Sequence, residues 1–289
     1  MKKINWRLQA LAVLAVSYPL SLLPCRFGEI LGLLLFHVWK SRRLIAIDNL
    51  KKSDLVLSNG ITPESIVRES FRNIGRSFIE IIKVYYGRGD AIMNKTEINN
   101  VGNYLAAKAK GRGVIVITGH CSNWELLPLV SSSRSESVSG VARPLNNPYI
   151  NSILERARSR YGSKIIYKRG ALKSVMATLR GGGIVGILMD QSVLPNEGFI
   201  IDFLGRKAWT TKMPAIVARK TGAAVLPVFI RKVKGGYEID VHPEVELSKN
   251  PITEEAVLED TKRFSGYIED NIRQNPSEWL WLHRRWKRA

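Results

Sequence analysis

Beginning near residue 103, short apolar runs alternate along the chain with longer amphipathic stretches of helical periodicity. They predict strands at 114–118, 137–142, 164–167, 184–189, 199–203, 224–231 and 236–242, and helices at 103–109, 123–132, 148–160, 171–180, 213–220 and 254–274. Strands that alternate with helices predict an α/β fold, with a largely parallel central sheet flanked by helices. In such sheets active sites form at the carboxyl ends of strands, so the residues after each strand are the first candidates for function.

The first forty residues differ in composition from the rest. Residues 8–24 are uncharged and follow a basic start, but they are slightly short of the ~20 apolar residues that a bilayer crossing needs. A second apolar segment, 27–39, has basic residues on both flanks, as a helix lying on a membrane surface does. A signal peptide is the alternative, but no small-residue cleavage site follows. We predict an N-terminal membrane-anchoring helix and an amphipathic helix in residues 1–40, and one globular domain in 41–289.

The charge balance narrows the class of partner. Lys and Arg number 44 against 25 Asp and Glu, which gives a net charge of +19 and favours nucleic acid, an anionic membrane or phosphorylated substrates. The tail places tryptophans 279, 281 and 286 among basic residues, which suits either stacking on nucleic-acid bases or lying at lipid headgroups. The apolar N-terminal segment favours the membrane. The sequence has no nucleotide-binding glycine loop and no spacing typical of a metal site, so we expect no metal.

The segment Thr118 to Glu125 carries the clearest chemistry. His120 follows the predicted strand 114–118, and Glu125 lies five positions on, in the expected first turn of a helix. A histidine is a suitable base for removing a hydroxyl proton, and a carboxylate on its second ring nitrogen would fix its tautomer. The backbone N–H groups of the helix start at Ser122 and Asn123 could receive an oxyanion or a phosphate.

Two other interpretations of this segment remain open. Ser122 and Glu125 have the spacing of a capping box, in which Glu125 would only bond back to the Ser122 backbone. Cys121 could be a thiol nucleophile, although adjacent side chains generally point apart and His120 is poorly placed to activate it.

Ordered sequence blocks extend beyond this segment. They are Ser41-Arg42-Arg43 with Asn49-Leu50, Ser70-Phe71-Arg72-Asn73-Ile74-Gly75 with Glu80, Gly-His-x-x-Asn-Trp-Glu around His120 and Glu125, Ala142-Arg143-Pro144 with Asn147-Pro148, Met189-Asp190-Gln191, Phe203-Leu204-Gly205, Pro214-Ala215 with Thr221-Gly222-Ala223, and the tail 279–287. On these blocks the chain resembles the lipid A secondary (late) acyltransferases, the lauroyl- and myristoyl-transferase group of the lysophospholipid acyltransferase superfamily. The His-x4-acid motif alone is weak, but the ordered set is specific.

The resemblance implies a glycerolipid acyltransferase-like fold and makes residues 41–289 an acyltransferase domain. It implies that His120 deprotonates the acceptor hydroxyl and that Glu125 orients His120. The transfer is then direct, without acyl-enzyme, cofactor or metal. The expected donor is a thioester of acyl carrier protein, or sometimes of coenzyme A. The expected acceptor is a lipid A (Kdo-lipid A) precursor, at the bacterial inner membrane with the catalytic domain facing the cytoplasm.

Further residues are candidates for substrate binding. Arg143 follows a predicted strand and is assigned to a phosphate, with a solvent-exposed arginine as the alternative. Asp190 also follows a strand, and we expect it to organise Arg143 or the surroundings of His120, unless it only caps a turn. Ser122 and Asn123 join them through the helix start. Lys168 and Arg169 form a charge run that either binds substrate or is a solvated face.

Three alternative functions remain. One is a related acyltransferase acting on another glycolipid or phospholipid, such as a phosphatidylinositol mannoside, and another is a non-catalytic lipid-binding relative. The third belongs to a different class, a basic nucleic-acid-binding protein, although we expect no nucleic acid as partner. The preferred acyl chain length depends on the depth of an apolar cavity, which a linear sequence does not contain.

Overall fold

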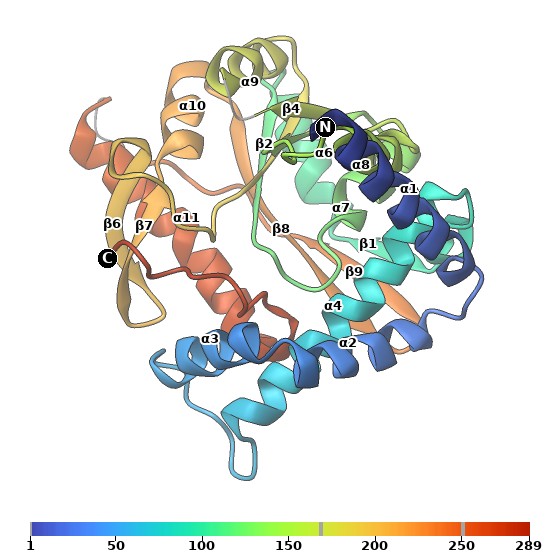
Figure 1. Cartoon of the computed structure of the whole chain (residues 1–289). Coiled ribbons are helices and arrows are strands. Elements are labelled where there is room, and N and C mark those ends of the chain that lie inside the picture. Colours follow the sequence, from blue (N-terminus) through green and yellow to red (C-terminus); the bar gives the residue numbers. More distant parts are fainter. Residues whose placement is uncertain (1, 168–169, 250–251) are drawn as a thin grey trace.

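A computed structural model describes residues 2–167, 170–249 and 252–289 as an α/β structure (Figure 1). Within these ranges the main sheet has seven strands, in the order β1-β9-β8-β2-β5-β3-β4. Their bounds are β1 Thr96–Asn99, β2 Val114–Thr118, β3 Val138–Ala142, β4 Lys164–Tyr167, β5 Ile184–Leu188, β8 Ala224–Val233 and β9 Gly236–Val241. Neighbouring strands run parallel, apart from the antiparallel pair β8 and β9. The predicted α/β fold with a largely parallel central sheet is confirmed.

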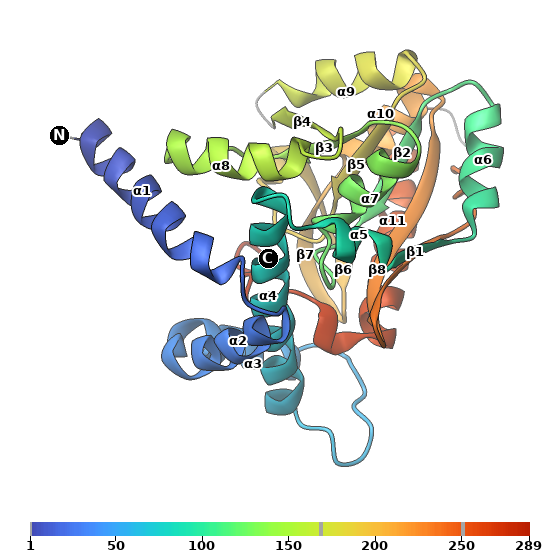
Figure 2. The ribbon, with the colours of Figure 1, turned by 90° about the vertical axis from the view of Figure 1, so that its right-hand side faces the viewer.

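Helices cover both faces of this sheet (Figures 1 and 2). They are α4 Pro63–Tyr85, α5 Asp90–Asn94, α6 Val101–Ala109, α7 Leu126–Arg134, α8 Pro148–Ser159, α9 Ala171–Arg180, α10 Met213–Thr221 and α11 Glu254–Gln274. Local sequence explains their ends. Asn147 caps α8 by accepting from the backbone N–H groups of Tyr149 and Ile150, and Gly222, with φ of 69°, ends α10 in the left-handed region.

One predicted strand lies outside the central sheet. Residues 199–203 belong to β6 (Gly198–Phe203), which pairs antiparallel with β7 (Arg206–Thr211) in a separate two-stranded sheet. Leu204 and Gly205 form the two-residue turn and have φ of 49° and 74°. Two consecutive positive φ angles match the twist of a tight hairpin, so this pair of strands closes on itself instead of joining the parallel sheet.

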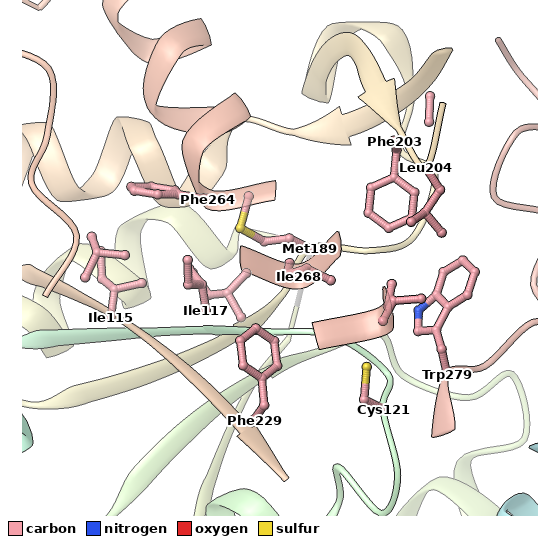
Figure 3. Close-up of a cluster of buried hydrophobic side chains, with 14 of the residues drawn as sticks. Ile115, Ile117, Cys121, Met189, Phe203, Leu204, Phe229, Phe264, Ile268 and Trp279 are labelled. Atoms are coloured by element: carbon pink, nitrogen blue, oxygen red, sulfur yellow. The ribbon is translucent and has the colours of Figure 1, made fainter. Parts of the chain in front are cut away.

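The two faces of the main sheet are built from alternate residues of the same strands. Ile115 and Ile117 of β2 point toward α11, where they meet Phe264 and Ile268 in a fully buried cluster (Figure 3). Val114, the neighbour of Ile115, belongs to a second cluster with residues of α7 on the opposite face. This alternation follows from the two-residue period of a β-strand.

The N-terminal helices lie against the edge of this domain. They are α1 Lys2–Leu20, α2 Arg26–Val38 and α3 Lys40–Lys51, and α1 extends away from the body (Figure 2). Glycines let α2 approach α4 closely, because a Cβ atom at Gly32 would lie 2.1 Å from the carbonyl oxygen of Phe71. Among the described residues, none of the helices has the length and apolar character needed to cross a membrane. The anchor in residues 1–40 and the boundary at residue 40 stay predictions.

The C-terminal tail is part of the core. Trp279, Trp281 and Trp286 are buried, and the Arg285 guanidinium, fully buried, donates to the carbonyl oxygen of Trp209 at 2.6 Å. The tail also pairs with the His120 loop, since the backbone N–H of Leu280 donates to the carbonyl oxygen of His120 at 3.1 Å. The expectation that these tryptophans stack on bases or lie at headgroups was wrong, because they are buried and pack against one another and against Phe203 of β6.

Candidate active site

His120 and Asp190 each lie two residues beyond the end of a strand, β2 and β5 respectively. These strands are parallel neighbours, with Thr118 in register with Leu188, so the two residues leave the sheet side by side. The Oδ1 atom of Asp190 lies 2.7 Å from Nδ1 of His120, and its Oδ2 atom accepts from the backbone N–H of His120 at 2.7 Å. The indole N–H of Trp279 donates to the same Oδ2 atom at 2.7 Å. Asp190 therefore holds both the main chain and the ring of His120.

The charge of Asp190 sets the tautomer of this histidine. Burial alone would raise the pKa of the Asp190 carboxyl, which is 2% exposed, but the His120 ring and the hydrogen bonds from His120 and Trp279 lower that pKa well below its ordinary range. An ionised carboxylate needs donors, so in the neutral ring Nδ1 of His120 carries the hydrogen and Nε2 keeps its lone pair. The amide nitrogen of Gln191 lies 3.0 Å from this Nε2 atom, where it can donate to the lone pair. His120 has the form that a general base requires.

Glu125 does not occupy the expected position on the second ring nitrogen. Its carboxylate accepts from Nε of Arg158 at 2.8 Å and from Nη2 of Arg158 at 2.5 Å. The pairing of His120 with Glu125 is thus replaced by two pairs, His120 with Asp190 and Glu125 with Arg158. Of the two roles expected for Asp190, organising Arg143 or organising the surroundings of His120, the structure shows the second. Glu125 and His120 still line the same cavity, so a catalytic role for Glu125 stays a prediction.

The loop between β2 and α7 differs from the predicted helix start. Helix α7 begins at Leu126, and its N-cap residue Glu125 makes no capping hydrogen bond through its side chain. Ser122 has φ of 51°, and its backbone N–H donates to the carbonyl oxygen of Glu278 at 2.7 Å. The amide of Ser122 therefore already has an acceptor, which argues against its binding an oxyanion and against the capping box.

Ser122 and Asn123 are buried and face the protein instead of the cavity. The side-chain amide of Asn123 donates to Oε2 of Glu80, a buried carboxylate on α4, at 2.8 Å. The same Oε2 atom accepts from the Tyr237 hydroxyl at 2.7 Å, and Oε1 accepts from Nε of Arg76 at 2.9 Å. This network attaches the loop that carries His120 to α4 and β9 through Asn123, and substrate binding by Ser122 and Asn123 stays a prediction.

A cavity of about 1260 Å³ opens in front of His120. Residues of the sheet and of helices α6, α7, α8, α9 and α10 line it, with Trp124, Glu125 and Gln191 beside His120. Most of its other walls are apolar, for example Val116, Leu127, Val138, Ile184, Leu226 and Val228. An apolar cavity with a few polar groups at one end suits a ligand with a long hydrocarbon part and one reactive group.

The remaining candidates have different positions. Arg143, exposed at the end of β3, lines the cavity and makes no hydrogen bond or ion pair with any other described residue. Lys168 and Arg169 lie outside the described residues. Cys121 is buried away from the cavity, and burial raises the pKa of its thiol well above the usual value, which disfavours a thiolate nucleophile. Within the described ranges, no group of three His, Cys, Asp or Glu residues is arranged to hold a metal.

Sequence reasoning missed three groups at this site. Gln191 directly follows Asp190, and its place after the same strand is the signal that could have identified it. Trp279 lies 89 residues after Asp190, to which it donates, and Glu80 lies 43 residues before Asn123, from which it accepts. Both residues belong to the ordered sequence blocks, but the blocks do not indicate these contacts, because the contacts depend on how distant segments pack.

An α/β fold with an oriented histidine beside a large apolar cavity has the parts that an acyltransferase acting on lipids requires. The family model for bacterial lipid A biosynthesis acyltransferases matches residues 3–288, and the chain belongs to this family. It is 26% identical over 266 residues to a lipid A biosynthesis palmitoleoyltransferase of Escherichia coli, covering 91% of this chain and 84% of the relative. It is 27% identical over 269 residues, with the same coverage, to a lauroyltransferase of E. coli. A phosphatidylinositol mannoside acyltransferase of Mycolicibacterium smegmatis is 22% identical over 227 residues, covering 78% and 73%.

Proposed function

We propose that this acyltransferase moves a fatty acyl chain from a carrier thioester to a hydroxyl of a lipid A precursor, with His120 as the general base. One observation carries the proposal. Asp190 binds Nδ1 of His120, which leaves the Nε2 atom of a histidine that lines an apolar cavity of about 1260 Å³ to accept a proton. A free fatty tail needs such a cavity, and a hydroxyl nucleophile needs such a base.

The reaction follows from this geometry. The acceptor hydroxyl takes the place of the Gln191 amide at Nε2 of His120 and gives up its proton to that atom as its oxygen attacks the thioester carbonyl. The carboxylate of Asp190 stabilises the imidazolium that forms. When the tetrahedral intermediate collapses, the carbon–sulfur bond breaks and the thiolate leaves with the proton from His120. The products are an ester and a free thiol, and His120 returns to its starting form.

The charged residues around the cavity support an anionic acceptor. Arg143 is exposed and unpaired among the described residues, so it is available to a phosphate of the lipid A precursor. Glu125 and Arg158 form a bidentate pair on the cavity wall, where they can orient sugar hydroxyls by hydrogen bonds. A net charge of +19 favours association with an acidic carrier protein as donor, with coenzyme A as the alternative.

The N-terminal helices support a location at the membrane surface. On α1, Ile4, Leu8 and Leu11 recur at helical spacing and are 64%, 59% and 60% exposed, and α2 likewise exposes Ile30 and Leu34. Basic residues lie near the start of α1, at Lys3 and Arg7, and at the two ends of α2, at Arg26 and Lys40. Exposed apolar rows with basic flanks favour insertion of α1 and α2 into the headgroup region of an anionic membrane. We place the protein on the cytoplasmic side of the bacterial inner membrane, where carrier thioesters are available.

The test is acyl transfer by the purified full-length protein. A lipid A precursor with free acyl-chain hydroxyls is incubated in detergent with carrier-protein or coenzyme A thioesters, and the products are identified by mass spectrometry. One added acyl chain, absent with His120→Ala, is expected. Lipid A from cells that lack the gene should lack the same chain. No transfer from either donor, together with unchanged lipid A in those cells, would refute the function. Transfer to a different glycolipid alone would mean that the acceptor is not a lipid A precursor.

A further inference from the structure

Two glycines lie side by side in the wall of the cavity. Gly140 of β3 and Gly186 of β5 are register partners, and Gly186 is also the partner of Val116 on β2. All three line the cavity. The row Gly140, Gly186 and Val116 therefore crosses three neighbouring strands and lacks a side chain at two of its positions.

The protein itself does not require glycine at either position. A Cβ atom at Gly140 would meet no heavy atom within 4 Å, and one at Gly186 would meet only Cγ1 of Val138 at 3.9 Å. Neither residue has the positive φ that favours glycine. Other glycines contrast with them, since a Cβ atom at Gly113 would lie 2.5 Å from a carbonyl oxygen and one at Gly236 would lie 1.9 Å from another.

Glycine inside a strand weakens the strand, so an unforced pair at adjacent positions needs another explanation. A strand glycine is commonly found where a ligand approaches the backbone closely. Here the open space beside both residues belongs to the cavity that His120 also lines. The missing side chains widen this cavity at one particular depth.

That depth follows from the strand register. Gly186 is four residues before Asp190, and its partner Val116 is four residues before His120. Four residues at the rise of a parallel strand place the glycines about 13 Å from the level of His120. The next cavity-lining residues along the same strands, Val138 and Ile184, are register partners and carry full side chains.

We infer that the gap at Gly140 and Gly186 receives the distal methylenes of the acyl chain and determines the longest chain that the enzyme transfers. This inference rests on the proposed acyl transfer. The row of Val138 and Ile184 then forms the floor below the gap. Filling the gap shortens the acceptable chain, and lowering the floor lengthens it.

The test measures kcat/KM of the full-length protein with a ladder of even-numbered saturated acyl thioesters. Gly186→Val and Gly140→Val should lower kcat/KM for the longest donors used by the wild type, by roughly 10–200-fold for each methylene that no longer fits, and leave short donors unchanged. Thermal stability should stay the same or rise, because valine favours strands. Val138→Ala should shift the preference toward longer donors. Gly266→Ala is the matched control, since its Cβ atom meets nothing within 4 Å and it lies on α11, away from the cavity.

The outcomes separate the inference from the function it rests on. If the wild type transfers no chain of any length, the proposed function fails. If it does transfer and folded glycine variants keep its chain-length profile, or lose all lengths equally, the inference is wrong. Should Gly186→Val not fold, Gly140→Ala and Gly186→Ala decide, because each adds one carbon where the structure has room.

Discussion

The two faces of the central sheet use the same strands for different purposes. On the face toward α11, Ile115 and Ile117 are 0% exposed and pack with Phe264 and Ile268 (Figure 3). On the face toward α7, Val116 borders a cavity of about 1260 Å³. The α11 side of β2 is closely packed, whereas the α7 face combines a buried cluster with a hollow that can admit a lipid chain. Substitutions on the two faces should therefore separate stability from chemistry.

The largest contrast is expected between two adjacent residues, His120 and Cys121. His120→Ala removes the base from the cavity and should lower turnover by about 10⁴-fold or more in a protein that still folds, with some loss of stability because the buried Asp190 carboxylate loses the ring as a partner. Cys121 belongs to the packed cluster, so Cys121→Ala should keep most of the turnover per folded molecule and lose some stability. Steady-state kinetics with melting curves measure both. Near-normal turnover of His120→Ala would show that His120 is not the general base. An inactive but folded Cys121→Ala would make the Cys121 thiol a candidate nucleophile again.

The next contrast concerns the two carboxylates near His120. Asp190→Asn should lower kcat by up to about 10⁴-fold, because an amide no longer fixes the tautomer or stabilises the imidazolium. Glu125→Gln should lower kcat far less, because Glu125 pairs with Arg158 and not with the ring. Steady-state kinetics of the two variants measure this contrast, and a larger loss of kcat with Glu125→Gln would make Glu125 the partner of His120 during the reaction.

These two carboxylates also mark how far the sequence leads. The alternation of apolar runs and amphipathic stretches predicts the α/β fold, and a histidine after a strand predicts one component of the site, because both depend on local patterns. The choice of Glu125 over Asp190 followed proximity in sequence. Which carboxylate binds the ring of His120 depends on β2 lying beside β5, and strand order comes from packing between distant segments. The tail shows the same limit, since its basic residues suggest solvent while Arg285 is fully buried against β7.

A packed-face substitution gives the third contrast. Ile117→Ala should lower the free energy of unfolding by about 2–5 kcal/mol, because Ile117 is fully buried and its removal leaves a void beside α11. The chain-length profile of the folded fraction should not change. Denaturant unfolding and the acyl thioester ladder measure the two properties. A shifted profile would mean that the packed face also shapes the acyl cavity, and the division between the faces would fail.

The buried tail gives a pH-dependent prediction for stability. Burial lowers the pKa of His283 from 6.5 to about 4, so the folded state binds its proton less readily than the unfolded state. Stability should therefore rise with pH between about 4 and 6.5, and His283 should account for up to about 3 kcal/mol of that rise. The measurement compares denaturant unfolding of wild type and His283→Gln across this window. Since other groups titrate in both proteins, their difference isolates His283, and parallel curves would contradict its burial as a neutral ring.

The smallest expected effect is at the exposed rim of the hollow face. Arg143→Ala should raise KM for the phosphorylated acceptor by about 10-fold, the size of one charge-assisted hydrogen bond, and leave the melting temperature unchanged. With an acceptor analogue that lacks the phosphate, the wild type and Arg143→Ala should have the same KM. Arg143→Lys keeps the charge without the bidentate geometry, so an intermediate KM is expected. If Arg143→Ala instead raises KM equally for both acceptors, the arginine shapes the rim of the cavity and does not bind a phosphate.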